Sequence, residues 1–241
     1  MAITFSELGK KGRLGNILFQ VAATIALALR NNDDYVFPNN WPDKKYFNIP
    51  LDKFVDKVYF SSKYNEPHFH YSPITYQPNL NLEGYFQSSL YMQPFEKEIK
   101  QLLTPNIKVE KQDYVSIHVR RTDYLIHKNC YHTLTRENYY DRAMELSGGK
   151  KFLIFSDDLN YCKSIFKGNE FNFAEGNSAV KDLTLMANCS GGNIIANSSF
   201  SWWGAYLNEF VNVISPNTWF GPELAASHNT KDLYLPRWVK V

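Results

Sequence analysis

The sequence has few cysteines and no motif typical of metal or disulfide chemistry. The three cysteines, Cys130, Cys162 and Cys189, are far apart and form no C-x-x-C pair. This pattern argues against a disulfide framework or a zinc site and is typical of a reducing compartment. The chain contains neither H-E-x-x-H nor D-x-D, so we expect no metal site. It also lacks a G-x-S-x-G nucleophile elbow and a G-x-x-x-x-G-K-[ST] phosphate loop.

The sequence also has no marked excess of basic or acidic residues and no long apolar stretch. The 26 basic and 24 acidic residues leave a net charge of +2 with no basic arm, so we expect no nucleic-acid partner. The longest largely apolar run, 21–29, is shorter than the ~20 residues of a membrane-spanning helix. The first residues lack the apolar stretch of a signal peptide. We therefore expect a protein with no membrane span, located in the cytoplasm.

Apolar residues make up 44% of the 241 positions, enough for a sizeable core. Their spacing alternates between the periods of strands and helices, which predicts a parallel sheet with helices on both faces. Expected strands are 2–8, 35–37, 82–87, 114–119, 151–155, 193–196 and 211–214. Expected helices are one capped by Asn16, then 93–103, 137–146, one ending near 166, 180–189 and 198–210.

An irregular stretch at 104–112 is the expected boundary between two halves. We expect an N-terminal Rossmann-like domain at 1–110 and a C-terminal one at 111–225. The remaining tail, 226–241, is expected to pack back on the first half.

The turn G-K-K-G-R-L-G-N at 9–16 lies between the first expected strand and helix. Glycines let the backbone approach a ligand, and a helix N-terminus offers free N–H groups to an anion. The spacing differs from the dinucleotide pattern G-x-G-x-x-G. An acid does follow about 20 positions on, at Asp33 or Asp34, as a nicotinamide site requires. Two interpretations of this turn remain open: a turn that only connects strand to helix, and the cofactor-binding turn of a nicotinamide-dependent dehydrogenase.

Two adjacent arginines, Arg120 and Arg121, follow the expected strand 114–119. In an open α/β sheet, ligands bind beyond the carboxyl ends of strands. Each guanidinium carries paired donors that match phosphate oxygens, so the pair is suited to a diphosphate. Asp123 could hold one arginine in a salt bridge. A solvated charge cluster is the alternative.

Two further loops follow strands in the second half. Asp157 and Asp158 could bind ribose hydroxyls or a metal, or cap the next helix. The serines at 198–201 stand at an expected helix N-terminus, which suits an anion or a simple cap. Asp182 carries the carboxylate that pairs with guanine, or is an exposed helical acid. Together these loops favour a diphosphate-bearing ligand in the second half.

Four motifs, in order along the chain, resemble those of a known protein family. They are GRLGNILFQVA at 12–22, GYFQS at 84–88, HVRRTD at 118–123 and DLTLMANCSGGNIIANSSFSWWGAYLN at 182–208. The sequence resembles glycosyltransferase family 11, the α-1,2-fucosyltransferases, and its length resembles microbial or viral members.

The resemblance implies a GT-B-like α/β fold of two facing Rossmann-like halves with parallel sheets. It implies GDP-β-L-fucose as donor and a galactose-containing glycan as acceptor. Transfer would invert the anomeric carbon and use neither metal nor other cofactor. A fucosyltransferase of other linkage and a non-catalytic GDP-sugar-binding protein are the alternatives.

The resemblance also implies roles for single residues. Arg120 would neutralise the charge on the leaving GDP, supported by Arg121, and Arg120 and Asp123 are the catalytic pair. The implied substrate-binding residues are Gly12, Arg13, Gly15 and Asn16 toward the fucose and diphosphate, Ser198, Ser199 and Ser201 near the diphosphate, Asp182 at guanine, and His118 and Asp157 at the nucleoside. Asp123, His132 and Glu83 are the candidates for a general base. A carboxylate paired with arginine is a poor base, which counts against Asp123.

Two departures from the family pattern lie in the first half. Ile17 replaces the usual glutamine after G-R-L-G-N, and the usual lysine after G-Y-F-Q-S is missing. Both concern the half expected to hold the acceptor. They therefore leave the natural acceptor open. The sequence also leaves open the oligomeric state and the identity of the general base.

Overall fold

The computed structural model describes residues 1–209 and 212–241, and the chain divides into two compact units. Unit 1 comprises 1–106 and 229–235, and unit 2 comprises 107–228 and 236–241. Of the tail at 226–241, which was expected to pack back on the first half, residues 229–235 belong to unit 1 and the others to unit 2. The expected helix end at Phe210 and strand start at Val211 lie outside the described residues.

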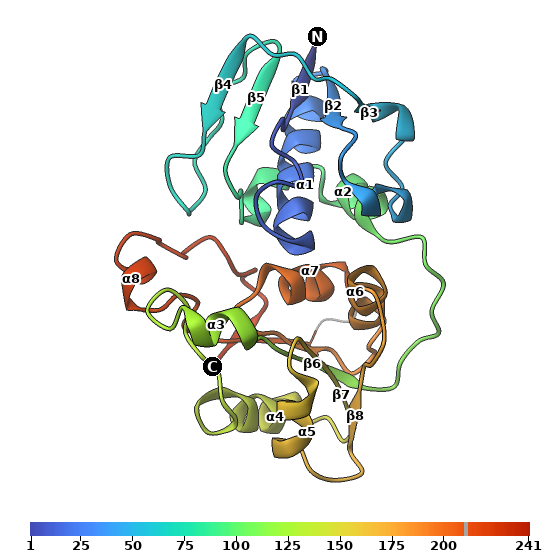
Figure 1. Ribbon diagram of the computed structural model, residues 1–241, viewed down its shortest axis with the longest axis vertical. Helices are drawn as coiled ribbons and strands as arrows, with labels where there is room; N and C mark the ends of the chain where they lie inside the picture. Colours follow the sequence, from blue (N-terminus) through green and yellow to red (C-terminus); the bar gives the residue numbers. More distant parts are fainter. Residues whose placement is uncertain (210–211) are drawn as a thin grey trace. The chain divides into compact units, whose positions relative to one another are not determined.

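Unit 1 contains a five-stranded parallel sheet in the order β3-β2-β1-β5-β4. The order reverses between β1 and β5, because the chain adds β2 and β3 on one side of β1 and β5 and β4 on the other (Figure 1). The strands are β1 (Ala2–Thr4), β2 (Asp34–Pro38), β3 (Phe54–Val55), β4 (Ser62–Asn65) and β5 (Leu80–Glu83).

Helix α1 (Leu14–Arg30) packs on β1 and β2 and is buried along nearly its whole length. It begins two residues before Asn16, so the prediction that Asn16 caps it was wrong. The cap position is Arg13, and the Asn16 side chain instead accepts a hydrogen bond from Gln87 Nε2 at 3.1 Å. The other helical segments of unit 1 are η1 (Pro42–Tyr46), η2 (Leu51–Lys53), η3 (Ser89–Met92) and α2 (Glu96–Leu103).

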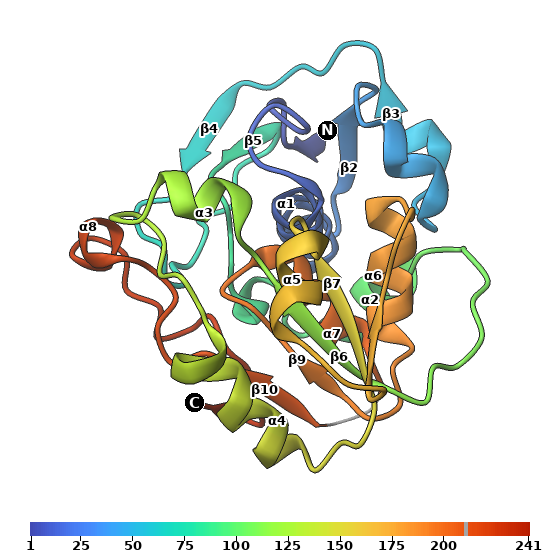
Figure 2. The same ribbon diagram turned by 60° about the horizontal axis from the view of Figure 1, so that its bottom comes forward.

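Unit 2 contains a six-stranded parallel sheet in the order β11-β10-β9-β6-β7-β8. The run from β10 through β9 and β6 to β7 can be followed in Figure 2. The strands are β6 (Val115–Val119), β7 (Phe152–Ser156), β8 (Phe171–Phe173), β9 (Asn193–Ile194), β10 (Val213–Ser215) and β11 (Val239–Lys240). All five residues of β6 are buried, as expected for a central strand covered on both faces.

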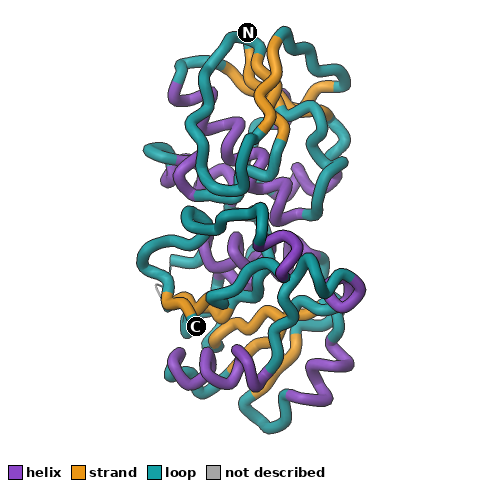
Figure 3. Tube along the Cα trace, turned by 90° about the vertical axis from the view of Figure 1, so that its left-hand side faces the viewer, coloured by secondary structure: helices purple, strands orange, loops and turns teal. Residues whose placement is uncertain are grey.

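Helices cover both faces of this sheet, which confirms the α/β prediction for unit 2. Helices α6 and α7 lie on one face and α4 and α5 on the other, and Figure 3 shows helices on both sides of these strands. The helical segments are α3 (Thr122–Ile126), η4 (Arg136–Tyr140), α4 (Asp141–Ser147), α5 (Leu159–Ile165), α6 (Ala179–Ala187), α7 (Ser199–Leu207) and α8 (Pro222–Ala225). The single helix expected at 137–146 is a π-helical turn, η4, followed by α4.

A buried amide network fixes α6 and α7 to the sheet. Asn193 Nδ2 donates to Ser116 Oγ at 2.6 Å and to the Met186 carbonyl at 2.8 Å. Asn208 Nδ2 donates to Asn193 Oδ1 at 2.8 Å, which joins the end of α7 to β9. Because buried amides are costly unless paired, this network specifies one arrangement of β6, β9 and the two helices.

Among the described helices, none has both the length and the apolar character needed to cross a membrane.

Candidate active site

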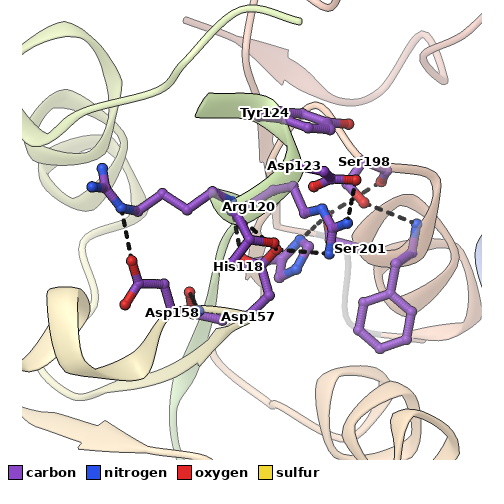
Figure 4. A network of polar contacts seen from close by, with 12 residues as sticks. His118, Arg120, Asp123, Tyr124, Asp157, Asp158, Ser198 and Ser201 are labelled. Atoms are coloured by element: carbon purple, nitrogen blue, oxygen red, sulfur yellow. Dashed lines mark hydrogen bonds and ion pairs between the residues drawn. The ribbon is translucent and has the colours of Figure 1, made fainter. Parts of the chain in front are cut away.

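The candidate site lies in unit 2 where the strand order reverses. The chain runs outward from β6 to β7 and β8, then returns to place β9 on the other side of β6. In open α/β sheets the crevice beyond such a reversal is the usual ligand site. Arg120 follows β6, Asp157 follows β7, and Ser198 follows β9. Figure 4 shows these side chains gathered at one place.

Two carboxylates hold the guanidinium of Arg120. Its Nη2 donates to Asp123 Oδ2 at 2.7 Å and its Nη1 lies 2.9 Å from Asp157 Oδ2. Its carbon Cζ lies 5.7 Å from the centre of the Tyr124 ring. The side chain is only 13% exposed, so its position is well defined. The predicted salt bridge between Asp123 and an arginine is confirmed.

Asp157 organises the loop that carries these groups. Its two oxygens accept hydrogen bonds from the Arg121 N–H at 2.9 Å, the Thr122 N–H at 3.3 Å and the Thr122 hydroxyl at 2.5 Å. With Arg120 Nη1 this makes four donors, about the capacity of one carboxylate. The acid expected to contact the nucleoside is therefore used to fix the end of β6 and the start of α3.

Arg121 pairs with a different acid from Arg120. Its Nε donates to Asp158 Oδ2 at 3.1 Å, and its guanidinium stacks 3.4 Å from the centre of the Tyr161 ring. Asp158 Oδ1 also accepts from the Tyr161 N–H at 3.1 Å and so caps α5. Arg120 and Arg121 are adjacent in sequence but make separate contacts. Arg120 pairs with Asp123, and Arg121 contacts the start of α5.

His118 and Ser201 are both buried and bonded to one another. His118 Nδ1 lies 2.9 Å from Ser201 Oγ, which also accepts from the Ala196 N–H at 3.2 Å. Burial, reinforced by the charge of Arg120, lowers the pKa of His118 to about 3, so the imidazole is neutral. This contact fastens the first turn of α7 to β6.

The N-terminus of α7 is the second structural element of the site, beside the loop that carries Arg120. Ser198 caps the helix by accepting from the Phe200 N–H, and Ser199 is the first helical residue. The preceding carbonyl, of Asn197, accepts from the Tyr124 hydroxyl at 2.7 Å. The Tyr124 ring in turn lies beside Arg120, so one side chain connects the two strand ends. The dipole of α7 directs partial positive charge toward this point.

The remaining predicted residues of unit 2 lie on neighbouring segments. Asp182 is in the first turn of α6, where its Oδ1 accepts from Asn177 Nδ2 at 2.9 Å and burial raises its pKa. The His132 carbonyl accepts from Asn197 Nδ2 at 2.9 Å, which places His132 next to the residue that precedes the α7 cap.

Gly12, Arg13, Gly15, Asn16 and Glu83 belong to unit 1. Gly12 has a φ of +82°, and a side chain there would overlap Asn16, so the turn requires glycine. Gly15 and Asn16 lie in the first turn of α1. Glu83 forms ion pairs with Lys11 and Lys63. Hydrogen bonds from these lysines lower the pKa of Glu83 to about 2, which makes it a poor base.

The acids that kept a nicotinamide site open have other roles. Asp34 is the first residue of β2 and pairs with Lys53 at 2.7 Å, and Asp33 accepts from the Tyr76 hydroxyl at 3.1 Å. Both lie at the amino end of β2, whereas ligands of such sheets bind at carboxyl ends. Neither is placed to hold a ribose.

Sequence analysis gave no role to four residues that shape the site, although two of them, Thr122 and Asn197, lie within its motifs. Thr122, Tyr124, Tyr161 and Asn197 all contact the predicted charged or serine-rich loops. Tyr124 could have been found from its spacing, four residues after Arg120. Across residues 1–209 and 212–241, no group of three or more His, Cys, Asp or Glu side chains is arranged to hold a metal ion.

Comparison with known proteins supports the family resemblance. Residues 11–241 match the model of glycosyl transferase family 11. An α-1,2-colitosyltransferase of Escherichia coli is 33% identical over 66% of this chain and 61% of its own length. An O-antigen biosynthesis glycosyltransferase of the same organism, WbnK, is 33% identical over 55% of this chain and 46% of its own length. The chain therefore spans between about half and three fifths of these two relatives.

A solved structure shares the fold. It is the NodZ α-1,6-fucosyltransferase soaked with GDP-fucose, with a TM-score of 0.50 and 14% identity, covering 90% of this chain and 95% of the other. This likeness confirms the predicted fold class, an α/β GT-B-like arrangement with parallel sheets. By the match over nearly its whole length, the chain belongs to glycosyl transferase family 11.

Proposed function

We propose that the protein transfers L-fucose from GDP-β-L-fucose to O2 of a terminal galactose in a glycan acceptor. Family membership supports the reaction class, and the names of relatives support the α-1,2 linkage. The observation that carries the proposal is the position of Arg120. Its guanidinium lies at the strand-order reversal of unit 2, beside the capped N-terminus of α7.

In this proposal the donor diphosphate binds at Arg120 and the N-terminus of α7. As fucose leaves, negative charge grows on the β-phosphate, and a fixed guanidinium stabilises that charge without reorganising. Asp123 and Asp157 hold the guanidinium in place before the donor binds. Asp123 is the more exposed of the two acids, so we expect it to move aside and yield its position to the diphosphate.

The transfer is a single displacement. The acceptor oxygen attacks C1 of fucose on the face opposite GDP, the bond from C1 to the β-phosphate oxygen breaks, and the β configuration becomes α. The hydroxyl proton passes to a general base. Because Arg120 substitutes for a cation at the diphosphate, we expect transfer to need no divalent metal.

We assign the base role to His132. Glu83 is held by two lysines and Asp123 by Arg120, and both pairings oppose proton uptake. His132 is fixed beside the α7 cap through its backbone carbonyl, and a neutral imidazole carries one nitrogen that can accept a proton. The acceptor proton would then reside on the imidazole until it exchanges with water.

Colitose is a second candidate for the transferred sugar. A relative at 33% identity is named for it, and the donor-side residues described above address the nucleotide, not the sugar. Parallel assays with GDP-fucose and GDP-colitose separate the two.

GDP release from GDP-fucose, with and without lactose or N-acetyllactosamine and in the presence of EDTA, tests the proposal. We expect release that depends on the acceptor and survives EDTA. Thermal stabilisation by GDP without any turnover would instead identify a GDP-sugar-binding protein. Protection by NADH but not by GDP would contradict the donor assignment.

A further inference from the structure

The segment 84–87 of unit 1 follows β5, next to β1, where the strand order of that sheet reverses. This is the same type of position that Arg120 occupies in unit 2. Its backbone is unusual, because Gly84 has a φ of +157° and Phe86 a φ of +53°. A left-handed phenylalanine is rare and persists only where its surroundings enforce it.

This backbone sends two adjacent aromatic rings to different environments. Phe86 is fully buried and packs edge-on against Phe5 and Tyr91, with ring centres 6.3 and 5.1 Å apart. Tyr85 as a whole residue is 42% exposed. The buried Phe86 ring anchors the loop, and the loop holds Tyr85 at the protein surface.

Glu66, from the end of β4, holds this conformation. Its Oε2 accepts from the Tyr85 N–H at 2.7 Å, and both of its oxygens lie 3.0 Å from the Phe86 nitrogen. A side chain at Gly84 would overlap the Glu66 side chain, so the carboxylate sits directly against the loop.

Two glutamines connect the loop to the glycine turn of α1. Gln20 Nε2 donates to the Gly84 carbonyl at 3.2 Å and to the Lys11 carbonyl at 3.4 Å. Gln87 Nε2 donates to Asn16 Oδ1 at 3.1 Å. Hydrogen bonds thus join the two motifs of unit 1, although about 70 residues separate them in sequence.

We propose that Tyr85 is a binding residue for the acceptor sugar, whose apolar C–H face stacks on its ring, and that Glu66 is a positioning residue for Tyr85. A phenol ring provides large contact area with few rotatable bonds, and its hydroxyl remains a polar handle. A loop already fixed by Glu66, Gln20 and Gln87 loses little further entropy when it binds. The ligand class is a neutral pyranoside, and its identity as a galactoside rests on the proposed function.

The test is saturation-transfer NMR of lactose binding to the whole chain in the presence of GDP, together with acceptor KM. Tyr85→Ala should weaken lactose binding about three- to tenfold, the loss of one aromatic contact. Tyr85→Phe should retain it. Tyr59→Ala is the matched control, because Tyr59 is 72% exposed in the same unit, on the loop before β4, and should bind as wild type.

Glu66 is tested by a conservative and a truncating variant. Glu66→Gln keeps an oxygen that accepts the two N–H groups and should retain most lactose binding, whereas Glu66→Ala should weaken it, by no more than Tyr85→Ala does. A role in folding alone would lower the melting temperature without changing the acceptor KM of the folded fraction.

The outcomes separate this inference from the proposed function. Lactose binding that is weakened about three- to tenfold in Tyr85→Ala, with no sugar transfer by the wild type, supports the sugar site and contradicts the transferase. Transfer to lactose with equal acceptor KM in wild type and Tyr85→Ala overturns the sugar site and leaves the transferase intact. Absence of any lactose binding by the wild type also overturns it.

Discussion

His118 Nδ1 lies 2.9 Å from Ser201 Oγ, so a residue of the central strand β6 is joined directly to the first turn of α7. The family resemblance implies that both residues contact the donor. Their burial and mutual bond give them another task, which is to hold the α7 N-terminus beside Arg120. Removing either partner would leave a buried polar group unpaired and shift that helix end.

Arg120→Ala should lower kcat by about 10²–10³, because it removes the fixed charge opposite the leaving phosphate. Arg120→Lys should recover only part of the rate, since one ammonium cannot bond two acids in the fork geometry of a guanidinium. Arg142→Ala is the control, because Arg142 is an exposed arginine of the same unit, paired with Glu145. Steady-state kinetics measure kcat for each variant. A near-wild-type kcat for Arg120→Ala would exclude a role of Arg120 in stabilising the leaving phosphate.

Asp157→Ala should destabilise unit 2 by about 1–3 kcal/mol, since it leaves the N–H groups at the start of α3 without their acceptor. Urea unfolding measures this change. Asp141→Ala is the matched control, because Asp141 is half exposed and pairs with Arg136, and it should change stability by less than about 1 kcal/mol. If Asp157 mainly contacts the nucleoside, its variant would unfold like wild type and lose only GDP affinity.

Acid should destabilise the protein through His118. Burial and the charge of Arg120 hold the pKa of this group at about 3 in the folded state, against 6.5 ordinarily. Between these values the unfolded chain binds more protons, so stability is complete above pH 6.5 and is lost as the pH falls. From pH 7.5 to pH 5 the His118 contribution should shrink by about 2 kcal/mol.

The measurement is the difference in unfolding free energy between wild type and His118→Gln at the two pH values. The variant does not titrate in this range, so the difference should narrow at pH 5. A difference that stays constant would mean that His118 takes up protons equally in the folded and the unfolded protein, so that burial does not lower its pKa.

His132→Ala should lower kcat by about 10²–10⁴ if His132 takes the acceptor proton. Glu83→Gln should leave kcat near the wild-type value, because hydrogen bonds from Lys11 and Lys63 lower the pKa of Glu83 to about 2 and keep it ionised. Near-wild-type rates for both variants would exclude a side-chain base among these residues.

The central strands of both sheets could be predicted because their residues are apolar and bounded by clear turns, as at 114–119 and 151–155. The stretch 38–80 could not. Its strands β3 and β4 are short and lie at the two edges of the sheet. Strand β4 has the sequence S-K-Y-N, which is mostly polar and so lacks the apolar pattern of a strand. Helix α3 was missed because its five residues begin inside the HVRRTD motif.

The residue types of the site and the pairing of Asp123 with an arginine could also be predicted, but the pairings between different strand ends could not. Val119 pairs with Ser156 in the register of β6 and β7, and this register alone places Arg120 beside Asp157. No local pattern specifies the register between strands about 37 residues apart. The same reason explains why Arg120 and Arg121 were expected to act together, although the fold assigns them different acids.

The most direct test of the proposed activity is the linkage and anomeric configuration of the product formed from GDP-β-L-fucose and lactose, determined by NMR. The account predicts α-linked fucose on O2 of the galactose residue. A β-linked product, or fucose on any other hydroxyl, would contradict it.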